Sequence, residues 1–399
     1  MTDAPSLAGA SASGSLAAES GWTGGQYSLG RAAIAAALAL HFWATWLSAR
    51  SAPQGAAAAA LAVLSACLLL GFGGRLLAGL TLLGLGAAAG SGLYPHGQFS
   101  AYALVALALH AATPPAPFGS FAAFGRIDPA GGWRYPEWVG RLAWLLLGLE
   151  CALRAGFELA DPTWRSGQAL SALLEGPAAR SALGQRLAGL GPTVLMALAW
   201  SASLLKLGFA LAAVSGRWRA PAFAMLLGAS LVALLFLEFT SEGLGRLLLL
   251  PFAFRPAWIP PRAAPRAELL FYDGACGLCH RAVRFLLAED DHGRALRFAP
   301  LLGERFREVV PAELQRALPD SLVLVTHEGE ALDKSRAVLY ALARLGGLWR
   351  LLAWCGQALP VALADPLYDA VARVRHRLFA APEEACPLLP PQLRVRFDP

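Results

Sequence analysis

The chain contains 399 residues, of which 56% are hydrophobic and 15% are charged. Soluble domains usually carry about 25% charged residues, so this composition argues against a soluble globular protein and indicates a membrane protein. The net charge of +6 comes mainly from the first 260 residues, which hold 15 basic and 10 acidic side chains. Since no basic stripe is interleaved with aromatic residues, we expect no nucleic-acid partner.

Two segments of unusual composition flank a long apolar region. Residues 1–26 are rich in Ala, Ser and Gly and contain neither Lys nor Arg. A cleaved signal peptide starts with a basic region, so we interpret this segment as a disordered leader. Residues 255–267 are rich in proline, which is typical of a semi-rigid linker between domains.

The region between them, residues 27–254, is expected to lie in the lipid bilayer. A helix needs roughly 20 apolar residues to cross the hydrocarbon core, and the pattern predicts a multi-pass α-helical membrane bundle of about six to eight spans. The candidate spans lie at about 27–48, 55–72, 76–93, 99–112, 138–157, 191–214 and 221–241.

Ionisable residues inside these apolar runs are costly to bury and therefore draw attention. Glu150 and Arg154 are four residues apart, which places them on one face of a helix. Lys206 and Glu238 are candidates to pair between neighbouring helices. Two interpretations remain open: the charges fix helix packing, or they form an intramembrane site for a quinone-like or other small ligand.

The last part of the chain, residues 268–399, predicts an α/β domain, because strand-like and amphipathic segments alternate there. Strands are predicted at 267–273 and 295–301, a hairpin around Glu328 and Gly329, and helices at 276–290, 303–318, 335–347 (with Ser335 as the N-cap), 348–359 and 365–379.

The segment "FYDGACGLCHRAVRFLL" (271–287) carries the clearest chemistry. Cys276 and Cys279 are three residues apart at the predicted start of a helix, so the two thiols lie on one face. Backbone N–H groups at a helix start stabilise a thiolate. We therefore expect Cys276 to attack a partner disulfide and Cys279 to resolve the mixed disulfide. Arg281 and Arg284 either add positive potential or are ordinary solvated charges.

Asp273 precedes the two cysteines and has two possible roles. Its carboxylate is suited to capping the helix or tying the turn, with Gly274 supplying a backbone angle that other residues disfavour. Alternatively, Asp273 transfers a proton to Cys279 while the mixed disulfide is resolved.

Two other chemistries compete with a redox dithiol. Cys276, Cys279 and His280 spell the C-x-x-C-H pattern of haem attachment, although no methionine follows residue 225 to serve as a second axial ligand. A zinc site needs two more ligands, from Cys355, Cys386, His292, His327 and His376. We expect no cofactor beyond the redox-active disulfide, with haem and zinc kept as alternatives.

Six blocks in this region resemble the DCC family of thiol-disulfide oxidoreductases, named for its Asp-Cys-Cys pattern. They are "LLFYDGACGLCHRAVRFLL", "LRFAPL", "LPDSLVLV", "SRAVLYALARLGG", "DPLYDAVARVRHRLF" and "CPLLPPQLRVRF". The resemblance implies a thioredoxin-like fold over 268–397, with Asp273, Cys276 and Cys279 carrying the motif. Ser321, Ser335, Tyr368, Arg375 and Cys386 also fall on characteristic family positions.

Further residues are candidates to support the dithiol. Pro319 is a candidate for the proline that faces the dithiol in thioredoxin sites, and the remaining supporting candidates are Tyr272, Gly274, Arg281 and Ser321.

The membrane region resembles HTTM-type membrane domains in "GFELADPTWRSGQAL" (156–170) and "PFGSFAAFGRIDPAGGWR". Glu158 stands where those domains commonly have lysine, and no residue role is carried over. We expect a bacterial inner-membrane thiol-disulfide oxidoreductase with its redox domain in the cytoplasm, acting on an unidentified protein or small-molecule thiol or disulfide. The alternative is a membrane transporter or ligand-binding protein with a redox-sensing dithiol domain.

Overall fold

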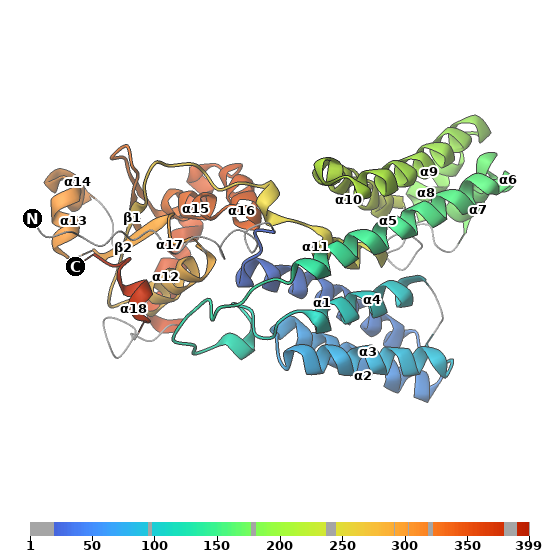
Figure 1. Ribbon diagram of the computed structural model, residues 1–399, viewed down its shortest axis with the longest axis horizontal. Helices are drawn as coiled ribbons and strands as arrows, with labels where there is room; N and C mark the ends of the chain where they lie inside the picture. Colours follow the sequence, from blue (N-terminus) through green and yellow to red (C-terminus); the bar gives the residue numbers. More distant parts are fainter. Residues whose placement is uncertain are drawn as a thin grey trace, which may run out of the picture. The chain divides into compact units, whose positions relative to one another are not determined.

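The computed structural model describes residues 20–94, 98–176, 181–236, 245–290, 292–301, 303–317, 322–378 and 389–398. The chain divides into two compact units, whose elements are labelled in Figure 1. The helical unit comprises Leu29–Pro115 and Pro136–Phe254. The sheet unit comprises the segment that ends at Ser28, together with Ala116–Tyr135 and Arg255–Pro399.

The helices of the helical unit are rich in Ala and Leu, for which the free-energy cost of adopting a helical conformation is among the smallest. Its helices are α1 (Gly24–Leu47, which starts in the sheet unit), α2 (Ala52–Leu70), α3 (Gly74–Gly90), α4 (Gln98–Ala112), α5 (Glu137–Ala160), α6 (Pro162–Arg165), α7 (Gln168–Glu175), α8 (Ser181–Ala188), α9 (Pro192–Val214), α10 (Arg219–Phe236) and α11 (Leu250–Ala253). Local chemistry fixes some of the ends. At α2, Ser51 accepts a hydrogen bond from the N–H of Gln54, and Gly71 ends the helix in the left-handed conformation.

Three helical segments among the described residues are long and apolar enough to cross a membrane: Ala52–Leu70, Pro192–Val214 and Gly216–Phe236. Gly74–Gly90 and Phe99–Ala112 are apolar but shorter. The sequence predicted about six to eight spans, because every apolar run near 20 residues was counted. Helix α5 is 24 residues long, but Glu150, Arg154 and Glu158 interrupt its apolar character.

The sheet unit contains a four-stranded mixed sheet in the order β2-β1-β3-β4. The strands are β1 (Glu268–Tyr272), β2 (Leu296–Pro300), β3 (Val323–Val325) and β4 (Ala331–Asp333). Strand β1 is parallel to β2, with Leu270 opposite Phe298, and β3 is antiparallel to both β1 and β4.

Helices cover both faces of this sheet. The helices described in this unit are α12 (Gly277–Glu289), α13 (Glu304–Val309), α14 (Ala312–Ala317), α15 (Lys334–Leu345), α16 (Gly347–Gln357), α17 (Val361–Leu378) and α18 (Pro391–Arg394), of which α12, α13 and α15 pack on the strands. Alternate residues of β1 point to opposite faces. Leu270 packs in a core with Leu286 of α12 and Ala341 of α15, whereas Phe271 packs in a second core with Phe306 of α13. The result is three layers, with β1 buried at the centre.

Two local predictions in this unit need correction. The single helix predicted at 303–318 is split into α13 and α14, because Pro311 lacks an N–H and disfavours helical geometry in the residue before it. Ser335 is not the N-cap of α15: the helix starts at Lys334 with Asp333 in the cap position, and the Ser335 hydroxyl donates to the carboxylate of Asp365.

The sheet unit includes residues that the sequence analysis assigned elsewhere. Of the expected leader 1–26, only residues 20–26 are described, and there Trp22 and Gln26 are buried. The Gln26 side chain accepts a hydrogen bond from the N–H of Leu348 at 2.8 Å. The Pro-rich stretch 255–267 also lies in this unit, and the N–H of Arg262 donates to the Ala343 carbonyl at 2.8 Å.

Candidate functional site

The turn between β1 and α12 is organised by Asp273. Its carboxylate accepts a hydrogen bond from the N–H of Ala275 at 2.8 Å, and its carbonyl accepts one from the N–H of Cys276 at 3.2 Å. These bonds reverse the chain directly after the central strand and deliver it to the start of α12. The contacts match the turn-tying role considered for Asp273, while proton transfer to Cys279 stays a prediction.

Cys276 occupies the N-cap position of α12, and its sulfur accepts a hydrogen bond from the N–H of Cys279 at 3.4 Å. Both cysteines are free thiols in this structure. They differ in burial: Cys276 is 0% exposed, whereas Cys279 is partly exposed. The thiol predicted to attack the partner is therefore the more deeply buried of the two.

The Cys279 thiol resists ionisation. Burial, a hydrogen bond with Cys276 and the negative charge that Cys276 carries when ionised raise the pKa of Cys279 to about 12, although the Asp273 backbone and the charge of Arg375 act in the opposite direction. At neutral pH, the reduced form of the site therefore carries a protonated Cys279.

His280 and Tyr272 support the turn from inside. His280 is buried, and its Nε2 atom lies 2.8 Å from the carbonyl oxygen of Gly274, within hydrogen-bonding distance. The ring of Tyr272 meets the His280 ring edge-on, with 5.7 Å between centroids. The histidine of the C-x-x-C-H pattern therefore binds the backbone of its own turn.

Helix α17 supplies two further contacts to the site. Nη2 of Arg375 lies 3.6 Å from Oδ2 of Asp273. The hydroxyl of Tyr368 accepts a hydrogen bond from the N–H of Leu322, at the start of β3, at 3.0 Å. The seven-residue spacing of Tyr368 and Arg375 corresponds to about two helical turns and therefore to one face. The seven-residue spacing is therefore the feature of the sequence that indicates that Tyr368 and Arg375 lie on the same face of α17.

The other candidate residues are distributed differently. Arg281 is exposed on α12, whereas Arg284 donates to the backbone carbonyls of Arg126 and Ile127. Pro319, Ser321 and Cys386 lie outside the described residues. Within the described part of the chain, no group of three or more His, Cys, Asp or Glu side chains is arranged to hold a metal ion.

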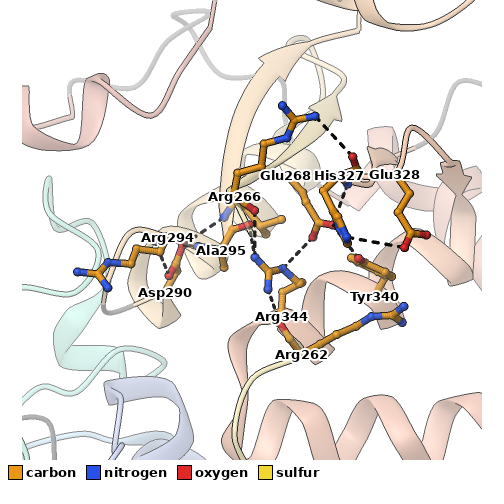
Figure 2. A network of polar contacts seen from close by, with 11 residues as sticks. Arg262, Arg266, Glu268, Asp290, Arg294, Ala295, His327, Glu328, Tyr340 and Arg344 are labelled. Atoms are coloured by element: carbon orange, nitrogen blue, oxygen red, sulfur yellow. Dashed lines mark hydrogen bonds and ion pairs between the residues drawn. The ribbon is translucent and has the colours of Figure 1, made fainter. Parts of the chain in front are cut away.

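A buried ionic network that sequence reasoning missed lies at the other end of β1 (Figure 2). Glu268 is 2% exposed and accepts hydrogen bonds from the Tyr340 hydroxyl at 2.7 Å and from the N–H of His327 at 3.1 Å. Its second oxygen lies 2.8 Å from Nε of Arg344. Burial alone would raise the pKa of Glu268, but the hydrogen bonds from His327 and Tyr340 and the Arg344 charge outweigh it, so the pKa is lowered.

Glu289, the last residue of α12, is a second buried carboxyl group that the sequence analysis did not predict. Glu289 is 2% exposed and accepts hydrogen bonds from the N–H of Gly25 at 2.7 Å, from the Trp349 indole at 2.6 Å and from the Thr23 hydroxyl. Burial is the main cause that raises its pKa. A Cβ atom at residue 25 would lie 2.6 Å from Oε1 of Glu289, so a larger residue there would force the carboxylate to move. The sequence signal for the burial of Glu289 is its position three residues after Leu286, which itself lies three residues after Val283, on the buried face of the helix.

The helical unit contains its own polar cluster. Glu150 pairs with Arg154 at 2.9 Å, as the four-residue spacing predicted, and also with Arg246 at 3.2 Å. Lys206 pairs with Glu158, whereas the Glu238 partner considered from sequence lies outside the described residues. A hollow of about 550 Å³ is lined by Leu146, Leu149, Glu150, Leu153, Arg154, Phe157 and Glu158.

Comparisons with known proteins identify relatives of the C-terminal region. The DCC1-like thiol-disulfide oxidoreductase family matches residues 270–381. The uncharacterized protein YuxK of Bacillus subtilis is 31% identical over 136 residues, which cover 33% of this chain and 94% of YuxK. A chloroplastic DCC family protein of Arabidopsis thaliana is 28% identical over 123 residues, which cover 31% of this chain and 70% of that protein. No solved structure matches. The chain therefore belongs, through its C-terminal domain, to the DCC1-like thiol-disulfide oxidoreductase family.

Proposed function

We propose that this protein is a membrane-anchored thiol-disulfide oxidoreductase in which Cys276 and Cys279 interconvert between a dithiol and a disulfide. The observation that carries the proposal is the hydrogen bond from the N–H of Cys279 to the sulfur of Cys276, which joins the two residues in the first turn of α12. The partner is an unidentified protein or small-molecule thiol or disulfide. The redox-active disulfide serves as the only cofactor.

The proposal includes a thioredoxin-like fold for residues 268–399. Support comes from the sheet order β2-β1-β3-β4, in which β3 alone runs against the other strands. Further support comes from the position of the cysteines, which directly follow the central strand at the start of a covering helix. In such an arrangement the helix start faces the edge of the sheet, where a partner thiol can approach.

The helical unit is the proposed membrane anchor, an HTTM-like bundle over residues 27–254 in a bacterial inner membrane. Three apolar segments of sufficient length support insertion. The outward side chains agree with lipid exposure: Leu211 and Val214 of α9 are 68% and 86% exposed, and Val232 of α10 is 56% exposed. The proposal keeps the C-terminal redox domain in the cytoplasm, where thiols are held reduced.

A second function is favoured by the polar cluster on α5. Glu150, Arg154 and Glu158 are the ionisable residues that line an otherwise apolar hollow, and ionisable groups at membrane depth often mark ligand or ion sites. In this alternative the protein is a membrane transporter or ligand-binding protein, and the dithiol senses redox state without turnover. The intramembrane site would then comprise Glu150, Arg154, Lys206 and Glu238.

Disulfide turnover distinguishes these functions. Full-length protein in detergent is expected to catalyse the reduction of insulin disulfides, and Cys276→Ser or Cys279→Ser is expected to lower the rate by about 100-fold or more. Cys355→Ser, at an exposed cysteine of α16, is the matched control and keeps full activity. A wild-type disulfide that forms and breaks reversibly without turnover would instead favour the sensor.

The reduction potential of the Cys276–Cys279 pair then gives the direction of electron flow. A value near about −270 mV is typical of a reductant, and one near about −120 mV is typical of an oxidant.

A further inference from the structure

Helix α17 carries its polar and apolar sides in the reverse order of a helix that faces water. The carboxylate of Asp365 accepts a hydrogen bond from the Ser335 hydroxyl, and Asp369 pairs with Lys334 at 2.9 Å. Both partners belong to the first turn of α15, so the acids of α17 are directed toward the domain. The opposite side of α17 is an exposed apolar stripe at four- and three-residue spacings, formed by Leu363, Leu367, Val371 and Val374. A helix at a water boundary normally directs its charged residues outward.

Helix α16 and the connection to α17 extend this apolar surface. Helix α16 packs against α15, and its residues Leu351, Leu352 and Trp354 are 42%, 46% and 47% exposed. From Leu351 to Ala364 the chain contains no charged residue. We call the exposed apolar side chains between Leu351 and Val374 the α16–α17 apolar face. Exposed apolar patches commonly mark a surface that binds a protein or a membrane.

The chemistry of this face favours lipid as the partner. Hydrogen-bonding side chains are sparse there, whereas protein interfaces usually include about one hydrogen bond per 100–200 Å². The guanidinium of Arg350 lies 5.0 Å from the centroid of the Trp354 ring. Trp and Arg side chains together are typical of the headgroup level of a bilayer, where the cation meets phosphate. We propose that the α16–α17 apolar face docks the redox domain on the surface of a phospholipid bilayer, with Arg350 and Trp354 at the headgroups.

The chain segments that hold α16 in place also lead into and out of the helical unit. The Gln26 side chain accepts the N–H of Leu348, and the carbonyl of Ile259 accepts the N–H of Gly347, each at 2.8 Å. Residue 26 is three residues before the start of the helical unit at residue 29, and residue 259 is five residues after its end at residue 254. Since a chain extends by at most about 3.6 Å per residue, a helical unit inserted in a bilayer keeps α16 within reach of lipid. The inference therefore rests on the proposed membrane anchor.

Docking also bears on the redox site, because the same helix contacts it. Arg375 of α17 lies 3.6 Å from Asp273 in the turn that carries the cysteines, and the Tyr368 hydroxyl accepts the N–H of Leu322 at the start of β3. A docked α17 therefore fixes the orientation of the dithiol turn relative to the bilayer.

The test maps lipid contacts on the wild-type chain. Full-length protein is reconstituted in phosphatidylcholine nanodiscs that contain a small fraction of lipid with a diazirine near the carbonyl end of one acyl chain. After illumination, lipid adducts are located by tryptic digestion and mass spectrometry. Cleavage after Arg350 and Arg373 releases residues 351–373, which include most of the apolar face, as one peptide.

Two other tryptic peptides serve as internal controls. Residues 308–316 come from α13 and α14, and α13 packs on the opposite face of the sheet from α15. Residues 187–206 come largely from an apolar segment long enough to cross a membrane and report insertion. We expect about tenfold more adduct on residues 351–373 than on residues 308–316.

A double variant tests the face itself. Leu351→Glu with Leu367→Glu places two charges on exposed positions, and we expect about tenfold less adduct on residues 351–373, because charge at the acyl boundary is costly. Val395→Glu, at an exposed apolar residue outside the face, is the matched control and keeps the wild-type yield. A double variant that is labelled as strongly as the wild-type chain overturns the inference.

The remaining outcomes separate the inference from the proposed function. Strong adducts on residues 351–373, weak ones on residues 308–316 and their loss in the double variant support docking. Adducts on residues 187–206 without adducts on residues 351–373, or equal adducts on residues 351–373 and 308–316, overturn docking and leave the membrane anchor standing. Adducts on none of the three peptides overturn the anchor and the inference together. Disulfide turnover is measured separately, so the exchange reaction is judged on its own result.

Discussion

The guanidinium of Arg375 lies 3.6 Å from the carboxylate of Asp273, and this contact links the last turn of α17 to the turn that carries the cysteines. Arg375 is only 6% exposed, so the charge acts in a partly desolvated environment where electrostatic interactions are stronger than in water. The same charge lowers the pKa of Cys279, against the larger effect of burial that raises it. Arg375 is thus a positioning residue for the turn and an electrostatic influence on the partly exposed thiol.

Substitution Arg375→Gln is expected to raise the pKa of Cys279 further and to slow the reaction of the reduced protein with glutathione disulfide about threefold to tenfold. It also leaves the Asp273 carboxylate without this cation, which costs about 1–2 kcal/mol of unfolding free energy. Arg373→Gln, on the same helix but exposed, is the matched control. If both variants changed the rate equally, a general effect of surface charge would explain the result and the positioning role would be wrong.

The reaction of the reduced protein with small disulfides is expected to depend steeply on pH. The pKa of Cys279 is raised to about 12, so the thiolate fraction increases about tenfold for each pH unit over the range below that value. If Cys279 is the attacking thiol, the rate constant rises in proportion between pH 7 and about pH 10. Stopped-flow measurement with an aromatic disulfide checks this. A rate that levels off below pH 9 would identify a more acidic thiol as the attacker.

The network around Glu268 is expected to dominate acid stability. Its pKa is lower in the folded chain than in the unfolded chain, so its stabilising contribution is complete above the unfolded value, about 4.3. As the pH falls through the folded pKa, protonation removes that contribution. Thermal unfolding of the full chain, followed as a function of pH, should show this loss only below about pH 4.5.

Substitutions separate the ionic part of this network from its hydrogen bonds. Glu268→Gln leaves the Arg344 charge buried without its carboxylate and is expected to cost about 3–5 kcal/mol. Tyr340→Phe removes one neutral donor and is expected to cost about 1 kcal/mol. The loss of stability at acid pH should persist in the Tyr340→Phe variant and be absent from the Glu268→Gln variant. Its persistence in Glu268→Gln would assign the acid sensitivity to another carboxyl group.

Sequence patterns predicted the features that depend on residues close together in the chain. The helix start after β1 follows from a short apolar strand and the change to helical periodicity. The Glu150–Arg154 pair follows from four-residue spacing alone. The motif cysteines lie three residues apart, and their common turn was likewise a local expectation, which the hydrogen bond between them bears out.

Features that depend on distant segments were beyond such reasoning. Thr23 and Glu289 are 266 residues apart in sequence, and no periodic pattern relates them. The burial of Cys276 depends on how the rest of the domain packs around its turn, which helix-terminus chemistry alone does not predict. Among the described residues three segments meet the length and hydropathy needed to span a membrane, fewer than the six to eight predicted, and charged residues such as Glu150 and Arg154 interrupt the apolar character of the long helix α5. Pro311 split the predicted helix at 303–318 by a local effect that the apolar pattern concealed.

Glu289 is expected to produce the opposite pH dependence from Glu268. Burial raises its pKa in the folded chain, so its contribution to stability is complete below the unfolded value, about 4.3, and declines as the pH rises through the folded pKa. Above the folded pKa the Glu289 carboxylate is ionised in a buried position, where it accepts hydrogen bonds from the Thr23 hydroxyl, the Gly25 N–H and the Trp349 indole. Thermal unfolding between pH 5 and 9 should therefore show a falling midpoint in the wild-type chain.

Two substitutions test the origin of that decline. Glu289→Gln is a neutral isostere, and we expect it to match the wild-type chain near pH 5 and to keep its midpoint at higher pH. Glu289→Ala leaves buried donors without an acceptor and is expected to cost about 2–4 kcal/mol at every pH. Because Glu289 contacts residues near the start of α1, limited proteolysis should cut near Thr23 sooner in the alanine variant. A midpoint that falls with pH in Glu289→Gln as steeply as in the wild-type chain would exclude Glu289 as the titrating group.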